Sequence, residues 1–116
     1  MIVDDSRIVF AEMKKLLADS DIEIAYYCRS GEEAISSYGD IRPDLVTMDI
    51  IMPGMDGLDT TRALLEKWPD ARVLMVSSLA YDDTMDKANE LGAKGFVYKP
   101  FTRETLISAI HQALGL

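Results

Sequence analysis

The sequence lacks the features that define several classes of protein. It contains a single cysteine, Cys28, so an intrachain disulfide and a cysteine-rich metal site are both excluded. No apolar run approaches the ~18 residues that a membrane-spanning helix requires. The amino-terminal residues also lack the basic flank and apolar stretch of a signal peptide. We therefore expect a protein of the reducing cytoplasm.

Basic residues are scarce as well. Lys and Arg number 12 against 20 Asp and Glu, which gives a formal net charge of -8. A surface of this sign repels phosphate backbones and anionic lipids, so we expect neither nucleic-acid nor membrane binding. Protein surfaces that carry Lys or Arg are the expected contacts.

What is present is a globular composition in which β-rich runs alternate with helical patches. The length of 116 residues is that of one domain, and we expect residues 1–116 to form it. The predicted strands are Met1–Val3, Ile22–Tyr27, Leu45–Met48, Val73–Val76 and Phe96–Tyr98. The predicted helices run from Ser6 to Asp19, from Ser30 to about Tyr38, from Leu58 to Trp68, from Asp82 to Leu91, and onward from Thr102. Ser30 and Glu33 form a predicted capping box.

The predicted strand Ile22–Tyr27 alternates, but the strands as a set show almost no alternation of polar with apolar residues. Such strands, separated by helices, predict a parallel sheet covered on both faces. Right-handed crossovers then favour an α/β, doubly wound arrangement. The first strand is short, because only three residues precede the acidic pair Asp4 and Asp5. Either the chain begins inside a longer one or this strand is clipped, and we expect marginal stability.

Charged residues follow three of the predicted strands. Asp4 and Asp5 follow the first strand, Asp49 follows the third, and Lys99 follows the fifth. The carboxyl ends of parallel strands share one edge of the sheet, where open α/β sheets bind ligands. Three carboxylates gathered there repel one another and stay ionised only with a cation among them. The pattern predicts a divalent metal site with an ammonium group for an anionic ligand.

Each of these residues also has an ordinary structural explanation. Asp4 and Asp5 suit the N-terminus of a helix, and Asp49 suits a turn. Lys99 suits a solvated surface, and Ser77 suits the end of a strand or a cap. Their convergence on one edge nevertheless favours a functional site.

Taken in order, these residues resemble the receiver domain of two-component response regulators, the CheY-like family. The resemblance spans essentially the whole chain. It implies a flavodoxin-like, five-stranded parallel sheet of order 2-1-3-4-5 with helices on both faces, and a cis peptide before Pro100. The segments that carry it are Asp4-Asp5-Ser6, Asp49, Met52-Pro53-Gly54-Met55-Asp56-Gly57, Ser77 and Lys99-Pro100-Phe101.

The resemblance assigns the phosphoryl chemistry. Asp49 resembles the phosphoacceptor, which takes a phosphoryl group from a phosphohistidine of a sensor histidine kinase; a carboxylate is a known covalent nucleophile for this purpose. Lys99 would pair with one phosphoryl oxygen as a compact charge, and the Ser77 hydroxyl would donate to another. The family member is a switch rather than an enzyme.

The resemblance also implies Mg²⁺ as the cofactor. Asp5, Asp49 and the backbone carbonyl of Ile51 would ligate the ion, with Asp4 acting through water. Oxygen ligands and several retained waters are what Mg²⁺ prefers.

Switching is assigned to Ser77 and Phe96, although Phe96 is equally well explained as a core residue. The signalling face for a downstream target would comprise the fourth helix, the fifth strand and the last helix, in a monomer or a phosphorylation-dependent dimer. Ile51 and Leu79 would flank the path of attacking water, and their apolar side chains predict a long-lived phosphoaspartate.

Two rival functions remain. The chain could be the regulatory part of a larger regulator with a DNA-binding or methylesterase output, since Leu74–Leu79 resembles receivers attached to chemotaxis methylesterases. A Mg²⁺-dependent phosphatase is the other rival. It resembles this chain less, because the second aspartate expected two residues after the nucleophile is replaced by Ile51 after Asp49 and by Arg7 after Asp5.

Overall fold

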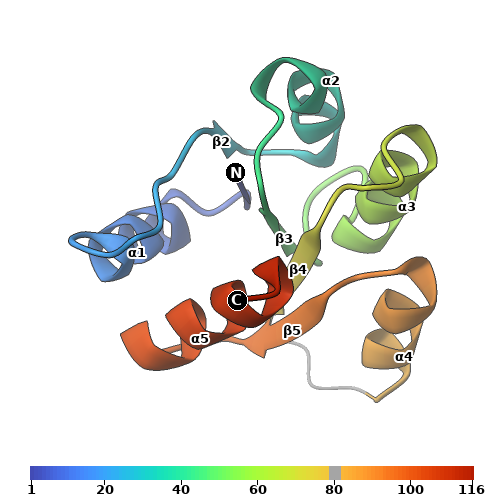
Figure 1. Ribbon diagram of the computed structural model, residues 1–116. Coiled ribbons are helices and arrows are strands. Elements are labelled where there is room, and N and C mark those ends of the chain that lie inside the picture. The colour runs from blue at the N-terminus through green and yellow to red at the C-terminus, as the bar shows by residue number, and fades with distance from the viewer. Residues whose placement is uncertain (79–81) are drawn as a thin grey trace.

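A computed structural model, which describes residues 1–78 and 82–116, shows a parallel five-stranded sheet between two layers of helices (Figure 1). The strand order is β2-β1-β3-β4-β5, so the predicted fold class is confirmed. The strands are β1 (Ile2–Val3), β2 (Tyr27–Cys28), β3 (Val46–Asp49), β4 (Val73–Ser77) and β5 (Gly95–Tyr98). The helices are α1 (Arg7–Leu17), α2 (Gly31–Ile41), α3 (Gly57–Lys67), α4 (Asp82–Leu91) and α5 (Arg103–Leu114).

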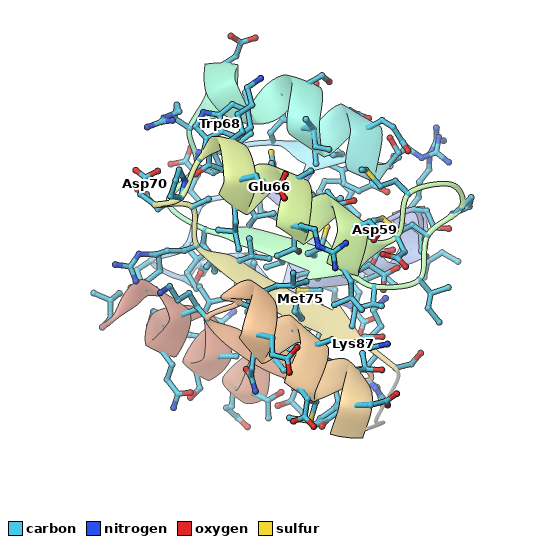
Figure 2. The ribbon with its side chains drawn as sticks, turned by 90° about the vertical axis from the view of Figure 1, so that its right-hand side faces the viewer. Asp59, Glu66, Trp68, Asp70, Met75 and Lys87 are labelled. Carbon is cyan, nitrogen blue, oxygen red and sulfur yellow. The ribbon has the colours of Figure 1, made fainter. Side chains whose placement is uncertain are left out.

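The two faces of the sheet bury separate apolar clusters. Helices α1 and α5 cover one face, and α2, α3 and α4 cover the other (Figure 1). Leu74 and Leu106 are fully buried in the first cluster, and Leu64 and Met75 in the second. Figure 2 shows Met75 behind the junction of α3 and α4. A sheet buried on both faces has no solvent-facing side, which explains why its strands show almost no polar alternation.

The second predicted strand is wrong over most of its length. The sequence predicted Ile22–Tyr27, whereas β2 comprises only Tyr27 and Cys28. Ile22 and Ile24 still pack against the cluster under α1 and α5, so their alternation reports burial rather than pairing. The neighbouring strand β1 offers two residues for pairing, and the ladder therefore cannot extend back along this segment.

The capping box predicted at the start of α2 forms only in part. The Ser30 hydroxyl accepts the amide of Glu33 at 3.1 Å, as expected. The Glu33 carboxylate accepts the amide of Arg29 at 3.3 Å, rather than that of Ser30. A reciprocal pair occurs instead at α5, between Thr102 and Thr105.

In the part of the chain that the structure describes, no helix is both long enough and apolar enough to span a bilayer.

Candidate functional site

The carboxyl ends of four strands bring the predicted residues to one edge of the sheet. Asp4 and Asp5 follow β1, and Asp49 is the last residue of β3. Ser77 is the last residue of β4, and Lys99 follows β5. The register of the parallel ladder aligns these ends, with Asp49 opposite Val76 and Ser77 opposite Tyr98.

Lys99 joins two of the acids. Its Nζ lies 3.0 Å from Asp4 Oδ2 and 3.2 Å from Asp49 Oδ1. The two carboxylates are almost fully buried, whereas the lysine side chain is 20% exposed. A solvated surface lysine would not make these contacts, so that explanation of Lys99 is wrong. The peptide between Lys99 and Pro100 is cis, as predicted.

Asp4 also retains a local role. Its Oδ1 accepts the amide of Ser6 at 2.8 Å, just ahead of α1, while Oδ2 accepts from Lys99. The structural and the functional explanations of this residue therefore both apply, one to each carboxylate oxygen.

The electrostatics of the pocket are unbalanced. Burial, with the negative charge of Asp4 added, raises the pKa of Asp49 to about 6, even though Lys99 acts in the opposite direction. Burial disfavours the ammonium charge of Lys99, but hydrogen bonding to Asp4 and the charges of both acids outweigh it and raise the pKa of Lys99. The single positive charge of Lys99 therefore cannot neutralise the negative charges of both Asp4 and Asp49.

The three carboxylates lie close enough together to hold a cation. One carboxylate oxygen from each of Asp4, Asp5 and Asp49 lies within 4.8 Å of the other two. Carboxylate oxygens at an open edge are the hard ligands that Mg²⁺ takes, since this ion retains several waters. The donor set therefore fits a divalent cation. Burial is the main cause of the raised pKa of Asp49, and such an ion would offset the second cause, the negative charge of Asp4.

The loop after β3 carries the remaining predicted ligand, the carbonyl of Ile51. The Ile51 side chain is 59% exposed, whereas its neighbours Ile50 and Met52 are buried and anchor the loop. The Glu32 carboxylate accepts the amide of Met55 at 3.2 Å, a contact between α2 and the loop that sequence analysis missed. Leu79, the other residue expected to flank the path of water, lies outside the described residues.

The predicted switch residues occupy different environments. Ser77 is buried at the edge of the sheet. Phe96 is half-buried and packs against the cluster under α2, α3 and α4. Its ring lies 5.1 Å from that of Tyr98, which is 41% exposed and donates its hydroxyl to Met85 Sδ at 2.7 Å. Tyr98 was not among the predicted switch residues, although a residue two positions after Phe96 lies on the same side of β5.

The fold and the cluster together define a class: a doubly wound α/β protein with acidic groups and one lysine at the ligand-binding edge of its sheet. The sequence profile of the response regulator receiver domain matches residues 1–111. The chain therefore belongs to the response regulator receiver domain family of two-component systems, and its fold is CheY-like.

Several relatives share this architecture. The chemotaxis protein CheY of Listeria monocytogenes is 36% identical over 113 residues, which is 97% of this chain and 95% of that protein. A chain of the CheX-CheY-BeF3-Mg+2 complex from Borrelia burgdorferi matches with a TM-score of 0.90 and 32% identity, covering 95% of this chain and 84% of that one. Protein-glutamate methylesterase/protein-glutamine glutaminase 3 of Geobacter sulfurreducens is 40% identical over 101 residues, or 86% of this chain but 27% of that protein.

Proposed function

We propose that this receiver domain, residues 1–116, is a phosphoacceptor switch that takes a phosphoryl group on Asp49 from a sensor histidine kinase. The observation that carries the proposal is the Lys99 ammonium, which contacts both Asp4 and Asp49 beside the three-carboxylate cluster. A carboxylate oxygen of Asp49 bonds to phosphorus while the phosphorus–nitrogen bond of the phosphohistidine breaks. The histidine nitrogen keeps the bonding electron pair.

The residues around Asp49 prepare it for this transfer. Lys99 moves from pairing with the free carboxylate to pairing with a phosphoryl oxygen, and the buried Ser77 hydroxyl donates to another oxygen. Asp4 keeps Lys99 at the site through its second contact.

Mg²⁺ is the proposed cofactor, and it supplies positive charge that offsets the negative charge on the transferring group. Asp5, Asp49 and the carbonyl of Ile51 would hold the ion directly. Asp4 would act through water, and its two oxygens also accept hydrogen bonds from Ser6 and Lys99. The Borrelia burgdorferi complex contains both BeF3 and Mg+2, and this supports the assignment by similarity.

The output is a change in partner binding rather than turnover of a substrate. Ser77 and Phe96 respond to the phosphoryl group, and α4, β5 and α5 form the face that a downstream target recognises in the cytoplasm. The polar helix α4 supports this role. A helix with few buried apolar side chains has low local stability, so little free energy is needed to shift it between conformations. Phosphorylation could leave the chain monomeric or pair two copies through the same face.

Amide hydrogen exchange tests the proposed face. Adding beryllofluoride with Mg²⁺ should change protection in α4, β5 and α5 more than elsewhere. Changes confined to α1 and α2 would contradict the proposed output.

Intact mass after incubation with acetyl phosphate and MgCl₂ tests the acceptor. We expect one phosphoryl group per chain, no labelling when EDTA replaces MgCl₂, and no labelling of Asp49→Asn. Asp44→Asn is the matched control, since Asp44 is exposed near the opposite end of β3 and should leave labelling intact. Labelling that persists in Asp49→Asn would contradict the proposal, and sustained hydrolysis of small phosphomonoesters would favour the phosphatase instead.

The second candidate, a regulatory part of a methylesterase or a DNA-binding regulator, shares the same phosphoacceptor chemistry. It is not favoured by the comparisons, in which chemotaxis CheY proteins match over nearly their whole length. The residues that flank this segment in the full gene product would decide between the two.

A further inference from the structure

Gly57, the first residue of α3, lies against the backbone of the acceptor strand. Its amide donates to the carbonyl of Ile50 at 2.8 Å, and the residue is buried. A β-carbon at this position would overlap the carbonyl oxygen of Asp49 and would lie 2.8 Å from both the carbonyl carbon of Asp49 and the Cα of Ile50. Non-bonded carbon atoms rest at about 3.5–4.0 Å, so no side chain fits.

Local conformation does not explain this glycine. Gly57 is not among the residues with positive φ, so other residues could adopt its backbone conformation. Alanine is a better helix former than glycine, and helix propensity alone would favour Gly57→Ala. The constraint is therefore the distance between the start of α3 and the end of β3.

Helix α3 cannot relieve such an overlap by moving away. Thr60 and Thr61 are fully buried on the inner side of the helix. A β-carbon at Gly31 of α2 would overlap Thr60 Oγ1, which shows that α2 and α3 are also in close approach here. In Figure 2 the first turn of α3 is marked by Asp59, at the end of the helix where the loop from β3 enters. The backbone of Asp49 and Ile50 lies nearest the added atom, and we expect it to be displaced.

Residues 49–51 include the proposed phosphoacceptor and a proposed ligand of the cation. Asp49 Oδ1 lies 3.2 Å from Lys99 Nζ, and the carbonyl of Ile51 is the proposed third ligand of the cation. We propose that Gly57 is a positioning residue: its missing side chain sets the approach of α3 to β3, and thereby the placement of the Asp49 carboxylate and the Ile51 carbonyl for Mg²⁺. The inference rests on the proposed function.

The test compares Gly57→Ala with Val73→Ala. Val73 is fully buried in the same sheet but begins β4 at the opposite edge, so its truncation lowers stability without touching the acceptor loop. Mg²⁺ affinity is measured on each folded protein by ¹⁵N-correlated NMR titration with MgCl₂, and acetyl phosphate labelling is followed by intact mass. Gly57→Ala should bind Mg²⁺ about tenfold more weakly than wild type, which is the usual size of effect for residues that orient metal ligands. Val73→Ala should stay within about twofold, as expected for a distant, independent site.

The outcomes separate the two proposals. Equal Mg²⁺ affinities for the two variants, with wild-type labelling intact, would overturn the role of Gly57 and leave the proposed function standing. A wild-type chain that neither binds Mg²⁺ nor becomes labelled would overturn the function itself, and this inference with it.

A measurement on the wild-type chain covers the case in which Gly57→Ala does not fold. Mg²⁺ titration should then shift the amide resonance of Gly57 more than that of Gly39, which packs against Trp68 instead. Equal shifts would overturn the inference.

Discussion

Charged side chains at the two edges of the sheet differ in burial and in their number of partners. At the carboxyl edge, buried Asp4 and Asp49 share a single base, Lys99, and Asp5 adds further negative charge. At the amino edge, His111 and Asp21 form a pair that is partly open to solvent. His111 Nε2 lies 3.0 Å from Asp21 Oδ1.

This difference indicates where the molecule stores unfavourable free energy. A buried charge left without a partner is costly, whereas an exposed pair contributes little. At the carboxyl edge, removing the base should therefore destabilise the chain and removing an acid should stabilise it. For the pair of His111 and Asp21 at the amino edge, either change should have a small effect.

The largest effect is expected from Lys99→Met, which leaves Asp4 and Asp49 facing each other without a base. The metal-free chain should lose about 3–5 kcal/mol of unfolding free energy, the usual cost of breaking a buried ion pair. Urea denaturation in EDTA measures the loss. Lys94→Met is the control, because Lys94 is exposed. A similar loss in both variants would show that the contacts of Lys99 are unimportant.

A change of opposite sign is expected from Asp49→Asn. Burial and Asp4 raise the pKa of Asp49, so its charged form is disfavoured in the folded chain at pH 7. Replacing it with a neutral isostere should raise the metal-free unfolding free energy by about 1–3 kcal/mol. Glu66→Gln on the outer side of α3 (Figure 2) should change it by less than about 0.5 kcal/mol. Destabilisation by Asp49→Asn in EDTA would refute the charge imbalance.

The smallest effect is expected at the amino edge, from Asp21→Asn. The hydrogen bond from His111 lowers the pKa of Asp21 below its ordinary value. A lowered carboxyl pKa adds stability above the unfolded pKa, and this contribution is lost as pH falls through the folded pKa. The variant should therefore lose stability slightly less steeply below about pH 4. Acid titrations of both chains followed by circular dichroism compare the slopes, and a steeper loss in the variant would contradict this account.

The composition of the candidate site was predictable because it depends on position along strands. Asp49 and Lys99 come at or after strand ends, and parallel strands have a common polarity, so the sequence alone could place them together. The resemblance then distinguished Asp49 from Asp4 and Asp5, which spacing could not do.

Other features depend on distances that no local pattern encodes. The length of β2 is limited by the short partner β1, so the apolar alternation of Ile22 and Ile24 was misleading. The close approach of Gly57 to Asp49 follows from how tightly α3 packs, whereas the predicted helix began only at Leu58 and left Gly57 outside it. The contact between Glu32 and Met55 joins residues that lie 23 positions apart.

The most direct test of the charge imbalance is the unfolding free energy at pH 7 measured with and without MgCl₂. If Asp5, Asp49 and their neighbours form a cation site in the folded state alone, Mg²⁺ at 100 times its dissociation constant should stabilise the chain by about 2.7 kcal/mol. Asp49→Asn should gain much less. Equal stability of the wild-type chain in MgCl₂ and in EDTA would contradict the account.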